Sequence, residues 1–579
     1  MRTCPRCGEG LPERSRFCPG CGAPVAVAPP ARERRKVVTV VFADVVGSTA
    51  LGERVDPETL RWALRRWFER MRAELERHGG RVEKFIGDAV VAVFGLPAVH
   101  EDDALRAVRA AAAMRAETER LGAVLRDERG VEIAVRIGIA TGEAVTGDAA
   151  AGGSFATGDV MNLAARLQQA ARPGETLVGH ETFRLVRHAV DAEPVTPLTL
   201  RGKAATVTAH RLLAVAPDAA ARRGRPHAPM VGRARERRRL ADAFEQAVAE
   251  RSCQLFTVVG APGVGKSRLV AEGLQAIGGT STIAAGRCLP YGDGLTWWPL
   301  VEALGHGLLS ACERDIPEPV GRVRGLLNGT GAAVAAEDAF WAVRKVLEAL
   351  ARRRPLVLVI DDLQWAEPTF VDLVEHVAEW SRGVPLLLLV MARPELLDHR
   401  PGWGGGKVNA TSVLLEPLHE HETRVLLGHL LGSAPLDAAD AGRIIRVAEG
   451  NPLYVEEFVA MLLDERAAAA GGDGDGPAAV DRLAGVAVPP TIQALLAARL
   501  DALGDAERAV LEAASVEGAE FARERVDALL GRRAGGSVAQ HLRALVRKDL
   551  IRPVVGLEGT FRFRHQLIRD AAYDGLSKA

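Results

Sequence analysis

Two stretches of the sequence, VVTVVFADVVGSTALGERV (Val37–Val55) and RVEKFIGDAVVAVFG (Arg81–Gly95), decide how the first half of the chain folds. The first is predicted to be a buried strand that delivers Asp44 near its end, before a Gly-Ser-Thr turn. The second is predicted to be two short apolar strands around a tight turn at Gly87 and Asp88. If this hairpin lies beside the first strand, Asp44 and Asp88 meet at one edge of a sheet. Paired carboxylates there predict a site for two divalent cations of the kind that accompany a nucleotide triphosphate.

The segments FADVVGST and EKFIGDAVVAVF resemble the catalytic core of class III nucleotidyl cyclases, which convert ATP to cyclic AMP or GTP to cyclic GMP. The resemblance covers residues 37–213 and implies a ferredoxin-like α+β domain. It also implies that Asp44 and Asp88 bind two Mg²⁺ or Mn²⁺ ions in the active site.

Asn162 and Arg166 stand on GDVMNLAARLQQAA (Gly158–Ala171), which is predicted to open a helix. Because they are four residues apart they share one helix face, a pattern that an ordinary polar surface also shows. In the resembling cyclases these positions hold the ribose and stabilise charge developing at the α-phosphate, to which a guanidinium offers forked donors. The family's active site is split, with one domain providing the metal carboxylates and the other providing Lys84, Asn162 and Arg166. Since one chain carries both sets, the resemblance implies a homodimer with two equivalent sites.

One position departs from the family pattern. Phe155 stands seven residues before Asn162, where an Asp or Thr usually selects the purine, whereas the companion lysine is present as Lys84. Phenylalanine cannot accept a hydrogen bond from the adenine amino group. The choice between ATP and GTP therefore stays open, and we take ATP as the expected substrate.

The rest of the cyclase-like region is predicted to contain two helices and two pairs of strands. Apolar residues at helical spacing predict helices over residues 56–80 and 102–120. Residues 131–148 are predicted to form a strand hairpin that turns at Gly142, and residues 198–213 to form the closing strands.

The N-terminus carries two C-x-x-C pairs, formed by Cys4, Cys7, Cys18 and Cys21. This spacing predicts a structural zinc ribbon over residues 1–24, since each tight turn aims two thiolates at one tetrahedral ion. A pair of disulfides is the alternative, which a cytosolic chain disfavours. The ribbon is also a candidate surface for a protein partner. Residues 25–36 are predicted to be a linker.

A second nucleotide motif follows a linker at residues 214–229. The segment QLFTVVGAPGVGKSRLV (Gln254–Val270) has the strand, G-x-x-x-x-G-K-S loop and helix of a Walker A motif. Backbone amides of this loop are expected to cradle the phosphates of MgATP, Lys266 to reach the β- and γ-phosphates, and Ser267 to bind magnesium. The glycines of the predicted loop are Gly260, Gly263 and Gly265.

The segment PLVLVIDDLQWAE (Pro355–Glu367) is predicted to be the Walker B partner of this loop. Asp361 is expected to support magnesium, and Asp362 or Glu367 to polarise water. Arg393 ends a further predicted strand, in the place of a sensor arginine.

The box before the P-loop resembles AAA-type and STAND ATPases, and AEGNPLYVEEF (Ala448–Phe458) resembles the lid signature of STAND ATPases. These resemblances imply an α/β NTPase domain with a lid over residues 230–463.

The C-terminal part is predicted to be a flexible linker over residues 464–489 and a winged-helix-like domain over residues 490–579. A winged helix can bind DNA, but in this setting packing against the nucleotide domain is favoured. Three further cysteines, Cys253, Cys288 and Cys312, lack metal spacing and are predicted to be buried thiols.

Composition favours neither nucleic acid nor membrane as a partner. The formal net charge is zero, and 26% of the 579 residues are charged. The longest apolar runs, such as VPLLLLVMA (Val384–Ala392), fall short of the ~18 residues that a membrane span requires. We therefore expect a cytoplasmic protein.

The domain order resembles the soluble adenylyl cyclase type and multidomain bacterial regulators. The predicted function is formation of cyclic AMP and pyrophosphate from ATP in a homodimer, regulated by the attached ATP-binding switch domain. The alternative is an ATP-dependent STAND signalling or transcriptional regulator whose cyclase domain is weak or inactive, an interpretation that Phe155 keeps open.

Overall fold

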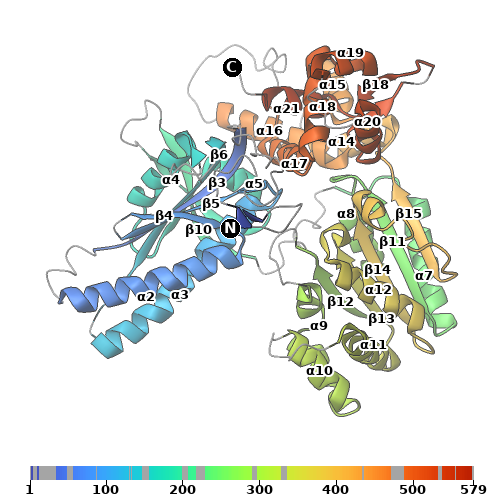
Figure 1. The fold of residues 1–579 in the computed structure, drawn as a ribbon, viewed down its shortest axis with the longest axis horizontal. Coiled ribbons are helices and arrows are strands. Elements are labelled where there is room, and N and C mark those ends of the chain that lie inside the picture. Colours follow the sequence, from blue (N-terminus) through green and yellow to red (C-terminus); the bar gives the residue numbers. More distant parts are fainter. Residues whose placement is uncertain are drawn as a thin grey trace.

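A computed structural model describes residues 2–3, 10–11, 34–47, 56–86, 88–129, 131, 133–146, 156–198, 206–216, 228–289, 296–327, 335–432, 436–470, 488–531, 537–554 and 556–576. These residues form three bodies (Figure 1). We call them the first domain (residues 34–216), the P-loop domain (230–415) and the C-terminal domain (418–576). The two short strands β1 (Arg2–Thr3) and β2 (Gly10–Leu11) pair antiparallel near the N-terminus. The four predicted zinc ligands lie outside the described residues.

The first domain is built on one mixed sheet in the order β4-β5-β3-β6-β8-β10-β9, with β7 paired to β6. Its strands are β3 (Arg34–Val45), β4 (Arg81–Ile86), β5 (Ala89–Phe94), β6 (Val135–Thr146), β7 (Ala156–Thr157), β8 (Thr176–Gly179), β9 (Val190–Leu198) and β10 (Val207–Val215). The order β6-β3-β5-β4, with one helix after β3 and one after β5, is the predicted ferredoxin-like arrangement.

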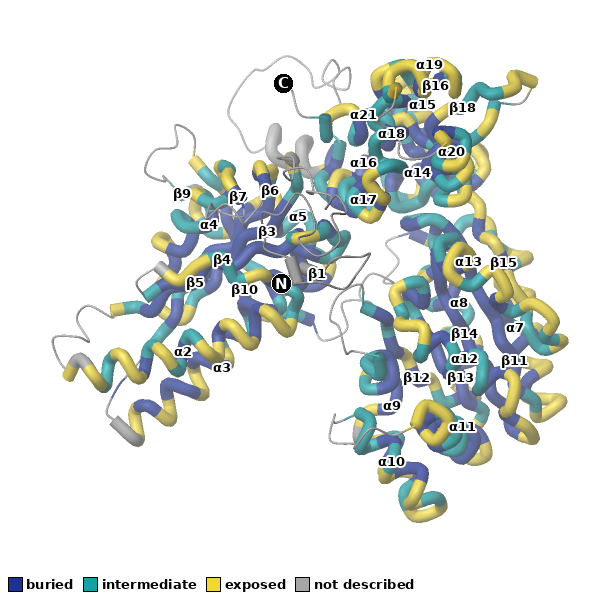
Figure 2. Tube along the Cα trace, viewed as in Figure 1, coloured by how far each residue is buried: buried dark blue, intermediate teal, exposed yellow. Residues whose placement is uncertain are grey.

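Helices cover both faces of this sheet. They are α2 (Pro57–Arg77), α3 (Asp103–Arg129), α4 (Asp159–Ala170) and α5 (His180–Val186). Alternate residues of β3 enter two cores, with Val41 packed on the α2 and α3 side and Val40 on the α4 side. Burial on both faces explains why the middle of β3, VVTVVFA (Val37–Ala43), is apolar apart from Thr39, and Figure 2 shows buried chain running through the sheet.

Two expectations for the first domain are wrong in detail. Residues 135–146 are one continuous strand rather than a hairpin, and Gly142 pairs with Val38 inside the ladder. A side chain at Gly142 would lie against Val160 of α4, so this glycine marks a close helix contact and not a turn. Helix α3 also continues to Arg129, beyond the predicted end at residue 120.

The P-loop domain is a five-stranded parallel sheet in the order β12-β13-β14-β11-β15. Its strands are β11 (Cys253–Gly260), β12 (Thr282–Arg287), β13 (Leu356–Asp361), β14 (Leu386–Ala392) and β15 (Ala410–Leu415). Its helices are α7 (Ala234–Ala249), α8 (Lys266–Ile277), α9 (Trp298–Cys312), α10 (Pro317–Leu327), α11 (Ala336–Arg353), the 3₁₀ turn η2 (Leu363–Trp365), α12 (Pro368–Trp380) and α13 (Glu395–His399).

Separate cores on the two faces bury the central strands of this sheet completely, which accounts for the runs LVLVI and LLLLVMA. The three cysteines predicted as buried thiols are buried and free, and burial raises the pKa of the Cys253 thiol to about 12.

The C-terminal domain packs helices around one core and carries a small antiparallel sheet in the order β16-β18-β17. Its helices are α14 (Glu420–Leu431), α15 (Ala438–Ala448), α16 (Pro452–Ala470), α17 (Pro490–Asp501), α18 (Asp505–Glu517), α19 (Arg523–Leu530), α20 (Val538–Arg547) and α21 (Gln566–Asp574). Its strands are β16 (Glu520–Ala522), β17 (Ile551–Pro553) and β18 (Thr560–Phe563).

These elements supply the predicted helices and β-hairpin of a winged-helix-like module. Helix α16 continues to Ala470, so the chain is helical over the first seven residues of the predicted flexible linker. Within the described part of the chain, every helix is too short or too polar to cross a bilayer.

Candidate functional sites

The first candidate site lies at the edge where β3 ends and the β4–β5 hairpin turns. Asp44 pairs with Ala89 in the antiparallel register of β3 and β5, and the Val45 amide donates to the Asp88 carbonyl at 3.3 Å. The two predicted carboxylates are therefore neighbours, as expected. Burial of the Asp44 carboxyl raises its pKa, and the charge of Asp88 adds to this, although Arg136 opposes both. A divalent cation bound between the two carboxylates would offset their mutual repulsion, so the pair fits the predicted Mg²⁺ or Mn²⁺ ligands.

Two further residues contact Asp44 at this edge and were not predicted from the sequence. Arg136, directly opposite Asp44 on β6, donates to Asp44 Oδ2 from Nε at 3.0 Å and from Nη2 at 2.7 Å. Gln168 of α4 donates to the same oxygen from Nε2 at 3.1 Å. The buried carboxylate is thus compensated within the chain. The sequence did contain a hint of the role of Arg136. It is the one charged residue in the apolar segment VRIGIA, and an arginine in a buried strand usually pairs with an acidic side chain.

Helix α4 turns the other predicted residues away from Asp44. Its buried face includes Ala164 and Gln168, whereas Asn162 is exposed and Arg166 is half-buried. Positions 166 and 168 point in nearly opposite directions on a helix of 3.6 residues per turn. Lys84 lies exposed on β4, at the far edge of the sheet. Phe155 lies outside the described residues.

The second candidate site is the loop between β11 and α8. Gly263 and Gly265 have φ angles of 76° and 103°, a left-handed region that favours glycine. The loop therefore adopts the tight bend predicted for a Walker A motif. Lys266 Nζ turns inward and donates to the carbonyl oxygens of Gly260 at 2.8 Å and Ala261 at 3.1 Å. Ser267 follows in the first helical turn, where its side chain is exposed.

The buried lysine is electrostatically poised for phosphate. Burial lowers the pKa of Lys266 to about 8, and Arg393 contributes in the same direction, while Asp362 and Asp361 oppose the shift. A phosphate bound beside Lys266 would place a negative charge next to its ammonium group and so stabilise the charged form that burial disfavours.

The predicted Walker B acids stand at the end of β13, where Asp361 is its last residue and Asp362 follows, close enough to Lys266 to affect its pKa. Burial raises the pKa of Asp361 to about 6, and the neighbouring charge of Asp362 adds to this. Burial also disfavours the Asp362 carboxylate, but Arg287, with Nη2 at 2.7 Å from Oδ2, and Arg393 together outweigh that effect and lower the pKa of Asp362 to about 2. Asp361 is thus the acid that a magnesium ion would stabilise most. Glu367 is exposed at the start of α12.

Arg393 directly follows β14, which lies beside the P-loop strand, in the predicted place of a sensor arginine. It is buried, its backbone amide donates to Gln364 Oε1 at 3.0 Å, and its guanidinium lies over the Trp365 ring at 5.7 Å. Its Nη1 pairs at 2.6 Å with Glu101, which belongs to the first domain.

The segment predicted as a lid closes on the P-loop. Asn451 Nδ2 donates to the Pro262 carbonyl at 3.0 Å, and the Leu453 amide donates to the Gly263 carbonyl at 3.3 Å. A side chain at Gly263 would collide with Asn451 Oδ1 at 2.7 Å. The C-terminal domain therefore rests directly on the phosphate loop.

Three family models match the chain in order. Residues 3–25 match the zinc-ribbon domain, residues 31–213 the adenylate and guanylate cyclase catalytic domain, and residues 229–390 the AAA ATPase domain. The chain joins a zinc ribbon, a nucleotidyl cyclase domain and an AAA-type ATPase domain. The cyclase and AAA-type resemblances and the multidomain α/β fold class are thereby confirmed. The STAND assignment stays a prediction.

Individual relatives extend over different shares of the chain. An uncharacterised protein of Rhizobium meliloti (strain 1021) is 27% identical over 94% of this chain, which spans 54% of that relative. An uncharacterised protein of Mycobacterium tuberculosis (strain H37Rv) is 37% identical over 30% of this chain and 32% of its own length. Among solved structures, the adenylyl cyclase CyaB from P. aeruginosa is 30% identical over 32% of this chain and 98% of its own, with a TM-score of 0.31. The chain spans about half the length, or less, of these two curated relatives.

Proposed function

We propose that the chain makes cyclic AMP and pyrophosphate from ATP in a homodimer, and that the P-loop domain is a MgATP-dependent switch that regulates this activity. The observation that carries the proposal is the arrangement around Asp44. The two acids converge at one sheet edge, while Asn162 and Arg166 stand on the face of α4 turned away from them. One chain thus holds two halves of a site that do not face each other, which is the division that a pair of chains would complete.

The proposed reaction assigns a task to each residue. Asp44 and Asp88 would hold two Mg²⁺ or Mn²⁺ ions, whose charge favours the triphosphate and the deprotonated ribose 3′-oxygen. That oxygen attacks the α-phosphorus, the bond to the bridging oxygen breaks, pyrophosphate leaves with the electron pair, and the 3′ proton passes to water. Arg166 and Asn162 of the partner subunit would hold the α-phosphate and the ribose. Arg136 and Gln168 keep the Asp44 carboxylate compensated before substrate arrives.

ATP is the proposed substrate because Lys84 offers a donor, which suits the acceptor N1 of adenine, whereas N1 of guanine carries a proton. Product analysis of the purified chain with ATP or GTP, and with Mg²⁺ or Mn²⁺, tests this choice. Cyclic AMP that disappears in Asp44→Ala supports the proposal. Cyclic GMP as the main product would overturn the assignment of ATP.

An ATP-dependent switch with a silent cyclase domain is the second candidate. The hydrogen bonds of Asp44 favour this candidate. Its Oδ2 already accepts from Arg136 and Gln168, so this oxygen is less available to bind a metal ion. This candidate predicts ATP hydrolysis that is lost in Lys266→Ala and no cyclic nucleotide from either triphosphate.

A further inference from the structure

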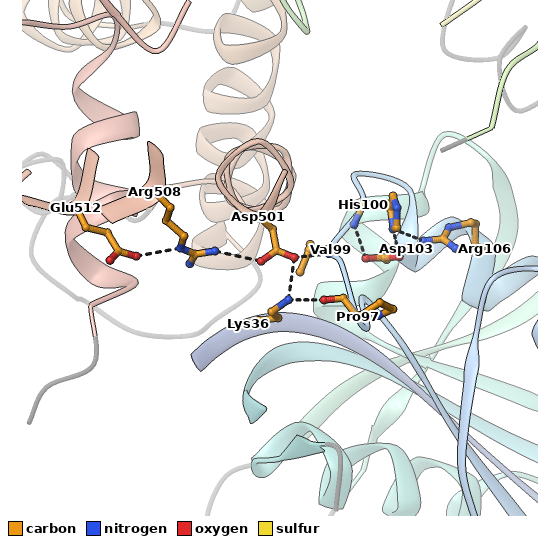
Figure 3. Close-up of polar contacts among 9 residues, drawn as sticks. All are labelled: Lys36, Pro97, Val99, His100, Asp103, Arg106, Asp501, Arg508 and Glu512. Atoms are coloured by element: carbon orange, nitrogen blue, oxygen red, sulfur yellow. Dashed lines mark hydrogen bonds and ion pairs between the residues drawn. The ribbon is translucent and has the colours of Figure 1, made fainter. Parts of the chain in front are cut away.

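The loop that joins β5 to α3, residues 95–102 and here called the docking loop, is one of the places where the cyclase domain contacts the rest of the molecule. Figure 3 shows the contact at one end of it. Asp501, the last residue of α17, accepts from Lys36 Nζ at 2.8 Å and from the Val99 amide at 2.9 Å through the same oxygen. Its other oxygen accepts from Arg508 Nη1 at 3.1 Å. The Asp501 side chain is only 7% exposed, so Lys36 and Asp501 form a buried ion pair between the first domain and the C-terminal domain.

The docking loop is held in shape within its own domain. Lys36 Nζ also donates to the Pro97 carbonyl at 2.5 Å, and the His100 amide donates to Asp103 Oδ2 at 2.8 Å. Asp103 in turn pairs with the buried guanidinium of Arg106. A loop tied in this way presents the next side chain, Glu101, in a fixed direction.

Glu101 points into the ATP site of the P-loop domain. Its Oε1 lies 2.6 Å from Arg393 Nη1, and Arg393 directly follows β14, the strand beside the P-loop strand. Glu101 is also close enough to Lys266 to influence the charge of that lysine. The Nε of Arg393 is buried without a hydrogen-bond partner among the described residues, so the guanidinium holds a donor in reserve for an anion.

We propose that Glu101 competes with the γ-phosphate of ATP for Arg393, so that docking of the cyclase domain and binding of ATP at the P-loop oppose each other. A carboxylate oxygen and a terminal phosphate oxygen are both anionic acceptors that suit a guanidinium. ADP lacks the γ-phosphate and does not displace Glu101. The coupling is reciprocal, since a contact that weakens ATP binding is itself weakened by ATP.

The place of the docking contacts in the sheet gives this competition a route to the cyclase. Lys36 lies on β3 and Pro97 follows β5, the two strands whose opposite ends carry Asp44 and Asp88. The docking contacts therefore lie at the ends of β3 and β5 that are opposite to Asp44 and Asp88. They do not cover the edge of the sheet that carries these two carboxylates. The competition itself does not depend on cyclase activity, so its test can succeed or fail separately from the proposed reaction.

Nucleotide affinity of the full chain tests the competition. Glu101→Gln removes the charge and keeps the size of the side chain. We expect ATPγS to bind the P-loop about tenfold more tightly in this variant, within the range of about 5- to 150-fold that is typical of such coupling, and ADP affinity to stay the same. In an Arg393→Ala background the same change should leave ATPγS affinity unaltered. Equal effects on ATPγS and ADP, or none on either, would overturn the proposal.

Two controls separate this effect from others. Glu119→Gln neutralises an exposed acid on α3, in the same domain but outside the docking contacts, and should change neither affinity. Binding that survives Lys266→Ala belongs to the cyclase site and is subtracted.

Hydrogen exchange in the unmodified chain provides a second measurement that needs no variant to fold. The Val99 amide is bonded across the interface to Asp501, whereas the His100 amide is bonded within its own domain to Asp103. ATPγS should speed exchange at Val99 and leave His100 protected, and ADP should change neither. Exchange at Val99 that ignores ATPγS would contradict the proposal.

Discussion

The Asp44 edge and the P-loop site are both built at strand ends, but a single chain provides very different shares of each. Around the P-loop, groups from all three bodies converge, with Lys266 and Arg393 from the P-loop domain, Asn451 from the C-terminal domain and Glu101 from the cyclase domain. Around Asp44, the described residues that converge are the two acids, Arg136 and Gln168, all of them from the first domain. The comparison teaches that the P-loop site draws groups from all three bodies of one chain, whereas the proposed cyclase site needs Asn162 and Arg166 from a second chain.

The largest expected effects come from removing one acid at each site. Asp88→Ala should lower cyclic nucleotide formation by about 100- to 1000-fold and leave ATP hydrolysis by the P-loop domain unchanged, because the carboxylate serves only the first site. Asp361→Ala should lower hydrolysis by a similar factor. Measuring cyclic nucleotide and ADP formation in both variants checks whether the two activities are lost separately. An Asp88→Ala chain that also loses ATP hydrolysis would show that the two sites are not independent.

The next largest effect is expected from a matched pair of glycine substitutions in β6. A Cβ at Gly138 would lie 2.2 Å from the Ala164 carbonyl and 2.3 Å from the Gln168 amide, both backbone atoms of α4, whereas a Cβ at Gly142 would lie 3.4 Å from Val160. Gly138→Ala should therefore lower the free energy of unfolding of the cyclase domain by about 1–3 kcal/mol, and Gly142→Ala by about 0.5 kcal/mol or less.

Denaturant unfolding of the two glycine variants checks this prediction. Because α4 also carries Arg166, the Gly138→Ala variant should lose cyclase activity while ATP binding at the P-loop persists. Equal stability of the two variants would mean that α4 is not packed against β6 as described.

The pH dependence of ATP binding gives a smaller effect confined to the P-loop. Burial lowers the pKa of Lys266 to about 8, and a bound phosphate would stabilise the charged form of this lysine. Below pH 8 the lysine is already protonated and affinity is flat; above pH 8 a proton must be taken up on binding, so affinity falls. Between pH 7 and pH 9 the loss should be about tenfold. Titration calorimetry at both pH values checks this, with Lys266→Arg expected to be flat because arginine stays charged.

The meeting of Asp44 and Asp88 could be predicted because each depends on local sequence, a buried strand followed by a hairpin with a tight turn. Arg136 and Gln168 could not be predicted in the same way, because their contact with Asp44 depends on the register of β6 against β3 and on the rotation of α4. Gly142 was misread because a glycine inside a strand pattern can mark either a turn or a close helix. The Glu101 contact depends on how domains dock, which no local pattern encodes.

Mixing two inactive variants tests the split cyclase site most directly. Asp44→Ala removes a metal carboxylate, and Arg166→Ala removes the residue that the partner subunit would supply. Each variant alone should make no cyclic nucleotide. An equal mixture should recover about a quarter of the unmodified activity, because half of the dimers are mixed and each mixed dimer has one intact site. No recovery after verified subunit exchange would contradict a cyclase site shared between two chains.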